Sequence, residues 1–356
     1  MWRLPMAEKS RNYGIDLLRM TCMYMVVILH ICGQGGILEA AEGTQNGAVA
    51  WFIRILAYCA VNCYGLISGY VGIDAKYKYS NLIVLWLHVI FYTVVITVCF
   101  AFAMPGSVGK GEVLNAVFPV MRKQYWYFTA YFCMFFFIPA FNLVVDSMPP
   151  KQLKALVIAL FVLFSLLPTL FHSDVFGVNG GYSALWLGVL YLFGAYIKRN
   201  GPVPGARAEK YAVLYLLCVV LTWGFRMVIG SYLDIYTSPT MVAAAVCLLI
   251  LFAGINTTPV IRKMIMIFAP LSFGVYLVHT HPLIWSYVMK NRFAEYAALT
   301  SVQLVFAVFA AALMIYLVCS LTDMVRSFIY RLLKIEETAD RIERRIRENV
   351  KLPGRE

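Results

Sequence analysis

The sequence is poor in charged residues. Only 13% of its 356 residues are Asp, Glu, Lys or Arg, whereas soluble domains carry about 25%. Hydrophobic residues make up 62% of the chain. Because so few polar side chains cannot cover a folded core in water, part of the solvent of this protein must be lipid. Lipid requires every backbone polar group to be paired internally, which restricts spanning segments to helices or closed barrels.

The sequence also lacks the short motifs of nucleotide, redox and zinc sites. It contains neither GxxxxGK[ST] nor GxGxxG, so we expect no nucleotide-binding domain. Its nine cysteines all fall in apolar runs and form no CxxC pair, so they are expected to act as small hydrophobic residues. We therefore predict no disulfide, no metal site and no bound cofactor.

What the chain does have is long apolar runs. Barrel strands would alternate at period two over about 10 residues, but the runs here are continuous and close to the roughly 20 residues of a spanning helix. The sequence therefore predicts an all-α, polytopic membrane helix bundle with about ten transmembrane helices. The ten runs cover residues 13–32, 49–70, 82–103, 125–145, 153–171, 182–197, 211–229, 240–255, 265–289 and 299–321.

The distribution of Lys and Arg predicts the orientation of the bundle, because short cytoplasmic loops are enriched in both. With a cytoplasmic N-terminus, the inner segments before the tail hold thirteen of these residues and the outer loops hold five. An even number of helices then places both termini in the cytoplasm. The net charge of +12 is thus explained by topology and by attraction to anionic lipid, and we expect no nucleic acid partner.

Two domains follow from this pattern: a transmembrane domain over residues 1–322 and a cytoplasmic tail over residues 323–356. The tail is basic, and its apolar residues recur every three or four positions, as in an amphipathic helix. They are Leu332, Ile335, Ala339, Ile342 and Ile346. We expect this helix to lie on the inner leaflet or against the inner loops.

The first run contains ionisable residues that lipid should exclude. Asp16, Arg19 and His30 fall on one stripe of the predicted helix, with His30 about 16 Å beyond Arg19. Each charge inside a membrane is costly and indicates a functional site. The alternative is structural: a buried ion pair near the inner interface and a hydrogen-bonded core histidine.

Two further segments carry candidate binding residues. In the ninth run, Ser272, Tyr276 and His279 are spaced i, i+4 and i+7 and share a helix face. At the start of the fourth run, Trp126 and Tyr127 fit an interfacial aromatic belt, and they equally fit a platform on which a sugar stacks.

The remaining polar residues of the runs have simpler explanations. His281 precedes Pro282, so we expect it to satisfy backbone groups that the proline loosens. His88 has no partner within its own run. Arg54 and Arg226 lie near the outer ends of their helices, where they either snorkel to the interface or hold an anionic group.

Taken in order, five segments resemble one family over roughly residues 11–321. "RNYGIDLLRMTCMYMVVILH" at 11–30 is similar to its first helix, with an Arg-x10-His spacing between Arg19 and His30. The other four are "YGLISGYV" at 64–71, "WYFTAYFCMFFFIPAFN" at 126–142, "YLFGAYIKR" at 191–199 and "LSFGVYLVHTHPL" at 271–283. The chain thus resembles the acyltransferase-3 family of integral membrane acyltransferases.

The resemblance implies a multi-pass enzyme of the cell membrane, a bacterial plasma membrane in the first instance. It implies transfer of an acyl group, usually acetyl, from acetyl-CoA or another cytoplasmic acyl-CoA to a hydroxyl of a sugar, lipid-linked glycan or other envelope molecule. His30 would be the base, or alternatively an acyl-histidine nucleophile. Arg19, oriented by Asp16, would meet CoA, and His279 would stabilise an oxyanion or position the acceptor.

Two other functions fit the same residues. A transporter or permease could line a path for a small polar solute with these histidines and arginines. An acyltransferase acting on a small molecule or a peptidoglycan precursor is the second alternative. Transfer of label from acyl-CoA, or solute uptake without such transfer, would distinguish them.

Overall fold

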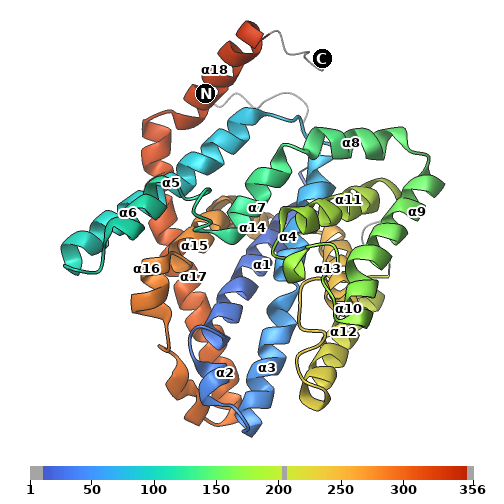
Figure 1. Cartoon of the computed structure of the whole chain (residues 1–356), viewed down its shortest axis with the longest axis vertical. Helices are drawn as coiled ribbons and strands as arrows, with labels where there is room; N and C mark the ends of the chain where they lie inside the picture. The colour runs from blue at the N-terminus through green and yellow to red at the C-terminus, as the bar shows by residue number, and fades with distance from the viewer. Residues whose placement is uncertain (1–10, 203–206, 351–356) are drawn as a thin grey trace.

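The computed structural model describes residues 11–202 and 207–350, and every regular element in that part of the chain is a helix (Figure 1). In chain order they are α1 (Tyr13–Cys32), α2 (Ile37–Ala40), α3 (Gln45–Tyr58), α4 (Ala60–Gly72), α5 (Tyr79–Ala103), α6 (Lys110–Val117), α7 (Trp126–Phe135), α8 (Ile138–Ser147), α9 (Pro150–Phe161), η1 (Val162–Leu166), α10 (Leu167–Phe171), η2 (Asn179–Gly181), α11 (Ala184–Asn200), α12 (Ala208–Val228), α13 (Pro239–Ala253), α14 (Pro259–Phe268), η3 (Ala269–Leu271), α15 (Ser272–His279), α16 (Pro282–Ile284), η4 (Trp285–Met289), η5 (Ala294–Ala298), α17 (Ser301–Leu332) and α18 (Ile335–Val350).

Local sequence signals set several helix starts. Asn12 caps α1 by accepting a hydrogen bond from the Ile15 N–H, and its own amide donates to the Ala253 carbonyl. Ser238 and Thr258 cap α13 and α14 in the same way, and each is followed by a proline. Proline is favoured at the first helical position because its missing N–H would be unpaired there anyway.

The protein is a multi-pass membrane protein by the length and composition of its helices. Within the described residues, seven helical segments are long and apolar enough to cross a membrane. The number rises to eight if α7 and α8, which bend by 57° at their junction, form one span. The all-helical bundle is therefore confirmed. The count of ten and the cytoplasmic placement of both termini stay predictions.

The ninth predicted span, residues 265–289, is not one helix. α15 ends at His279, His281 adopts an extended conformation (φ −59°, ψ 132°), and α16 starts at Pro282. Proline disfavours the helical conformation in the residue before it, which explains the break. His279 is consequently the last residue of its span, and not well inside it as the continuous run suggested.

Two of the family-like segments pack on each other. They are the C-terminal halves of α4 and α11. A Cβ at Gly69 would lie 1.8 Å from the Tyr191 carbonyl oxygen, and one at Gly194 would lie 1.9 Å from the Leu66 carbonyl oxygen. Glycine at both positions lets the two backbones touch, as small residues commonly do between membrane helices.

The long helix α17 continues through Leu332, past the predicted domain boundary at residue 322. Asp323, where the predicted tail starts, is fully buried in the bundle. It accepts hydrogen bonds from the Tyr92 hydroxyl and from Arg326, and it contacts His88 Nε2 at 2.9 Å. His88 therefore does have a partner, on a helix far away in the sequence.

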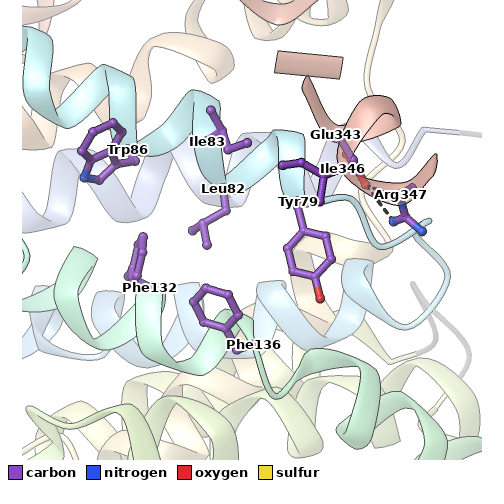
Figure 2. Close-up of a pocket in the computed structure, with 9 residues that line it drawn as sticks. All are labelled: Tyr79, Leu82, Ile83, Trp86, Phe132, Phe136, Glu343, Ile346 and Arg347. Atoms are coloured by element: carbon purple, nitrogen blue, oxygen red, sulfur yellow. Dashed lines mark hydrogen bonds and ion pairs between the residues drawn. The ribbon is translucent and has the colours of Figure 1, made fainter. Parts of the chain in front are cut away.

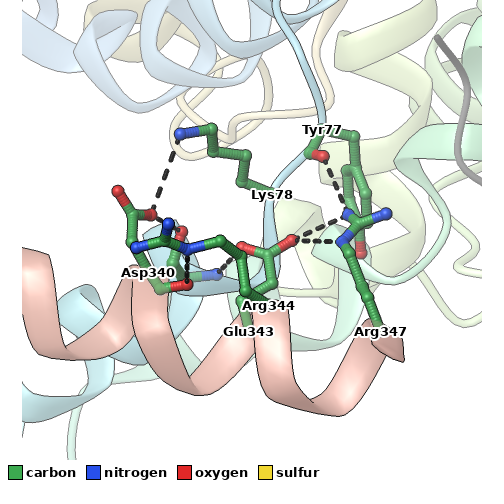
Figure 3. Close-up of polar contacts among 7 residues, drawn as sticks. Tyr77, Lys78, Asp340, Glu343, Arg344 and Arg347 are labelled. Atoms are coloured by element: carbon green, nitrogen blue, oxygen red, sulfur yellow. Dashed lines mark hydrogen bonds and ion pairs between the residues drawn. The ribbon is translucent and has the colours of Figure 1, made fainter. Parts of the chain in front are cut away.

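The predicted amphipathic helix of the tail forms as α18, and it packs against the start of α5 (Figure 3). Glu343 accepts a hydrogen bond from the Ser80 N–H at 2.9 Å, and Asp340 accepts one from the Ser80 hydroxyl at 2.7 Å. Lys78, the residue before α5, does not cap it with its side chain. Glu343 of α18 thus satisfies a backbone donor at the N-terminus of α5, and Asp340 holds the side chain of the same serine.

Candidate active site

Two hollows in the bundle differ sharply in chemistry. The larger, about 400 Å³, lies between α5, α7 and α18 (Figure 2). Its lining is apolar apart from the Glu343–Arg347 ion pair, with no histidine or cysteine among the described residues that line it. The lining residues are Tyr79, Leu82, Ile83, Trp86, Phe132, Phe136, Glu343, Ile346 and Arg347. This groove fits an apolar group and supplies no base or nucleophile.

The smaller cavity, about 180 Å³, is bounded by α1, α4, α7 and α15 and carries the reactive groups. Of the eight residues that the sequence predicts for the site, six line it: Arg19, His30, Trp126, Tyr127, Ser272 and Tyr276. The other two contact lining residues, since Asp16 pairs with Arg19 and His279 touches His30. The structure therefore brings all eight together.

His30 and His279 form a hydrogen-bonded pair with a defined donor and acceptor. His30 Nδ1 lies 2.9 Å from His279 Nε2, and His279 Nδ1 bonds to the Val275 carbonyl oxygen. Because a carbonyl only accepts, His279 Nδ1 carries the hydrogen, and Nε2 of the neutral ring is an acceptor. His30 must then donate through Nδ1, which leaves a lone pair on its Nε2. His279 is almost completely buried, so this arrangement is shielded from water.

Aromatic packing fixes the His30 ring from another side. The Trp285 ring meets it edge-on, with ring centroids 4.5 Å apart. Trp285 follows the break after α15, so the turn that interrupts the ninth run also delivers this side chain to the site.

The charged end of the cavity is built on the first two turns of α1. Arg19 Nη1 donates to Asp16 Oδ1 at 2.7 Å, and Arg11 Nε donates to the other oxygen at 2.6 Å. Asp16 is 7% exposed and Arg19 is 34% exposed, so the carboxylate is held inside while the guanidinium remains accessible. The carboxylate thus holds one edge of the Arg19 guanidinium, and the two residues share a face of α1 as the stripe on the first run predicts.

The aromatic residues at the start of α7 form one wall. The Trp126 ring stacks on Tyr236 with centroids 6.1 Å apart and leans on Tyr182 at 4.5 Å. Tyr127 meets Tyr64 and Tyr276 edge-on. Both Trp126 and Tyr127 line the cavity, so they are placed to contact a bound molecule in addition to any belt at the membrane interface.

Ser272 and Tyr276 reach the cavity from α15. The Ser272 hydroxyl lies 3.5 Å from the Phe268 carbonyl oxygen and 3.3 Å from the Tyr316 hydroxyl, which are long contacts. Tyr276 packs between Tyr125, Tyr127 and Phe273. The predicted face of this helix is therefore the one that the cavity uses.

Sequence reasoning missed Tyr64, Tyr236 and Trp285. Tyr64 donates its hydroxyl hydrogen to the Arg19 carbonyl at 2.7 Å, and Tyr236 lines the cavity. Tyr64 opens the family-like segment at 64–71, but that resemblance assigned it no role, and nothing in the segments around Tyr236 and Trp285 marked either residue. His281 takes the backbone role expected of it, because its Nδ1 accepts from the Leu283 N–H.

The comparison with known families covers most of the chain. No curated protein and no solved structure matches it. A family model described as "Acyltransferase domain" matches residues 12–323, from the cap of α1 to the buried carboxylate of α17. The chain belongs to the acyltransferase-3 family and is an acyltransferase.

Proposed function

We propose that the protein transfers an acyl group, acetyl in the simplest case, from cytoplasmic acyl-CoA to a hydroxyl of a cell-envelope sugar or glycan in a bacterial plasma membrane. One observation carries the proposal. His30, held by His279 at 2.9 Å, shares a cavity with Arg19. A base and a cation separated by about 16 Å along one helix suit a donor and an acceptor that enter from different ends.

In the proposed step His30 acts as a general base. Its Nε2 accepts the proton of the acceptor hydroxyl while the hydroxyl oxygen attacks the thioester carbonyl. The C–S bond then breaks, and the CoA sulfur leaves with the proton returned by His30. His279 accepts the His30 Nδ1–H throughout, which steadies the positive charge on the ring during the transfer.

Arg19 serves the donor side. A guanidinium presents a rigid fork of donors that matches phosphate oxygens, so Arg19 would bind a phosphate of CoA. Asp16 fixes one edge of that fork through the 2.7 Å contact. Arg11 shares the same carboxylate, which places two positive charges at this end of the cavity.

The remaining residues serve the acceptor and the developing oxyanion. Both ring nitrogens of His279 are engaged, so we assign His279 to positioning His30 and not to direct contact with substrate. Ser272 and Tyr276 line the cavity from the same helix, and their hydroxyls would donate to the oxyanion. Trp126 and Tyr127 would stack on the sugar ring.

Label transfer tests the function. Membrane vesicles carrying the protein are incubated with radiolabelled acetyl-CoA, and label is followed into lipid-linked and envelope material. His30→Ala should reduce transfer at least about 100-fold, the usual contribution of a general base, at an unchanged amount of folded protein. His172→Asn is the control, because His172 is exposed and outside the cavity. Full activity of His30→Ala, or solute uptake without transfer of label, would contradict the proposal.

A further inference from the structure

Arg54 is a partly buried cation of the bundle that has no ion-pair partner among the described residues. It lies on α3, within the candidate span Gln45–Gly72. It makes no hydrogen bond or ion pair with any residue that the structure describes, and its Nε is buried without a partner. Among the other arginines of the candidate spans, Arg19 pairs with Asp16, Arg226 with Asp234 and Arg326 with Asp323. Arg262 and Arg331 each donate to a neutral oxygen.

The surroundings of Arg54 compensate its charge only in part. The guanidinium lies over the rings of Trp51, at 5.1 Å, and Tyr58, at 5.8 Å, which gives cation–π attraction. Its Nη1 also approaches Gly33, at the C-terminal and partially negative end of α1. Arg54 forms no hydrogen bond with the carbonyl acceptors at that helix end or with any other described acceptor, and a partly buried charge without bonded acceptors is costly in a membrane. The surroundings of Arg54 therefore suit a ligand that supplies hydrogen-bond acceptors.

Arg54 is next to the candidate active site. Gly33 ends α1 three residues after His30. Because the Arg54 guanidinium lies beside Gly33, it is about one helical turn beyond the proposed base. A row of aromatic rings leads from the cavity to it. Trp126 stacks on Tyr236, Tyr236 stacks on Tyr58 at 4.8 Å, and Tyr58 lies beneath Arg54.

We propose that Arg54 binds a carboxylate or phosphate group of the acceptor, so that the acceptor is an anionic glycan or glycan precursor. The proposal rests on the proposed function and names its substrate class. A guanidinium binds either oxyanion through two parallel hydrogen bonds. Arg19 takes the donor inside the cavity, and Arg54, which lies beside Gly33 and outside the cavity lining, anchors the acceptor beyond His30.

Arg226 offers a matched control within the same neighbourhood. Its guanidinium lies 3.8 Å from the Trp51 ring, the ring that Arg54 also contacts. Unlike Arg54, it is neutralised by Asp234 at 3.1 Å. Removal of Arg226 leaves Asp234 without its cation, whereas removal of Arg54 leaves no described group unpaired.

The test measures the melting temperature of the full-length protein in phosphatidylcholine nanodiscs. Inorganic phosphate and glucuronic acid are the anionic probes, and glucose and chloride at matched ionic strength are the controls. The wild type should show a saturable rise with at least one anionic probe only. Arg54→Gln should lose this rise and keep or raise the melting temperature without probe, because an unpaired charge has gone. Arg226→Gln should lower the melting temperature and keep the rise.

Several results would overturn the site. Arg54→Gln could respond to the anions as the wild type does, or could melt several degrees lower without probe, which would make Arg54 a structural residue. If only Arg19→Gln loses the rise in melting temperature, the anion binds at Arg19, at the donor end of the cavity. If phosphatidylglycerol in the nanodisc stabilises the protein through Arg54 and abolishes the response to soluble anions, the ligand is a lipid headgroup.

A transfer assay separates this proposal from the proposed function. Labelled products are fractionated by anion exchange to isolate those that carry an anionic group. Arg54→Gln should raise the apparent KM for the acceptor about tenfold to hundredfold, because the hydrogen bonds to a charged group are lost. The KM for acyl-CoA should not change, and Arg54→Lys should recover part of the loss. If the wild type binds anions through Arg54 but transfers no label, the proposed function fails and the anion site stands. If Arg54→Gln transfers like the wild type, only the anion site fails.

Discussion

His30 presents a free Nε2 only while His279 accepts its Nδ1–H. His279 can accept because the Val275 carbonyl engages its other nitrogen. Substitution His279→Leu removes the acceptor, so the His30 ring is free to move its hydrogen and turn its lone pair away from the cavity. We expect kcat to fall about 100-fold, with an unchanged KM for acyl-CoA.

His279→Gln supplies the control for that prediction. A glutamine oxygen can accept near the position of the lost Nε2, so this variant should recover part of kcat, while the leucine variant should not. Steady-state kinetics on both variants, at equal amounts of folded protein, give the comparison. Equal activity of His279→Leu and the wild type would show that His30 needs no orienting partner.

Single residues were predictable where the signal is local. The stripe of Asp16, Arg19 and His30 is visible because one helix carries all three, and the fixed rise and rotation of a helix place them. The partner of His88 was not visible, because Asp323 lies 235 positions away on another helix. Arg54 could be marked as a candidate anion site, but only tertiary contacts show that Arg226 is neutralised and Arg54 is not.

Among elements, the contact between α4 and α11 depends on two glycines. Alanine at Gly69 or Gly194 would place a methyl group into the facing backbone, and such overpacking costs about 1–3 kcal/mol. Both variants should therefore lower the melting temperature of the purified protein. The close contact also explains why two separate family-like segments occur together: each supplies one side of the same interface.

Gly224→Ala on α12 is the matched control for these variants. No atom lies within 4 Å of a Cβ at that position, and alanine is about 1 kcal/mol better than glycine inside a helix. Its melting temperature should stay the same or rise slightly. If all three alanine variants behave alike, close backbone packing does not hold α4 and α11 together.

Helix bounds were predictable where an apolar run is continuous and ends in capping residues, as for α1, whose predicted and observed bounds agree. The ninth run shows the limit of that reasoning. Its hydrophobicity continues across the break before Pro282, so hydropathy favours one long helix while backbone sterics enforce a turn. The turn brings Trp285 against the His30 ring, and so the site depends on a feature that hydropathy hides.

At the scale of the whole molecule, α18 connects the C-terminal end of the described chain to the membrane bundle. Figure 1 shows α18 and α2 at opposite ends of the molecule. The amphipathic pattern predicts the helix, but its partner is chosen by polar contacts that the pattern does not contain. Ala339 and Glu343 are buried against the bundle, while Ile342 and Ile346 remain exposed. The hydrogen bonds from Ser80 to Glu343 and Asp340, and not the apolar stripe alone, therefore fix where α18 docks.

This docking should depend on pH through Glu343. Burial raises the pKa of its carboxyl, but the hydrogen bonds from the Ser80 N–H and from Arg347 outweigh burial and hold the pKa below its ordinary value of 4.5. A group with a lowered folded pKa stabilises the folded state above its unfolded pKa. That contribution is lost as the pH falls below about 4.5 and through the folded pKa.

Hydrogen exchange of peptides covering residues 77–82 and 335–347, corrected for the intrinsic effect of pH, measures the docking. In the wild type, protection should be full near neutral pH and should decline below about pH 4.5. Glu343→Gln should lower protection near neutral pH and flatten its pH dependence, because the amide keeps one acceptor but no charge. Asp340 also bonds to Ser80, so the difference between the two proteins isolates Glu343.

Glu337→Gln, exposed on the same helix, should match the wild type. Unchanged protection of the wild type at pH values well below the folded pKa would show that apolar packing alone holds α18 in place.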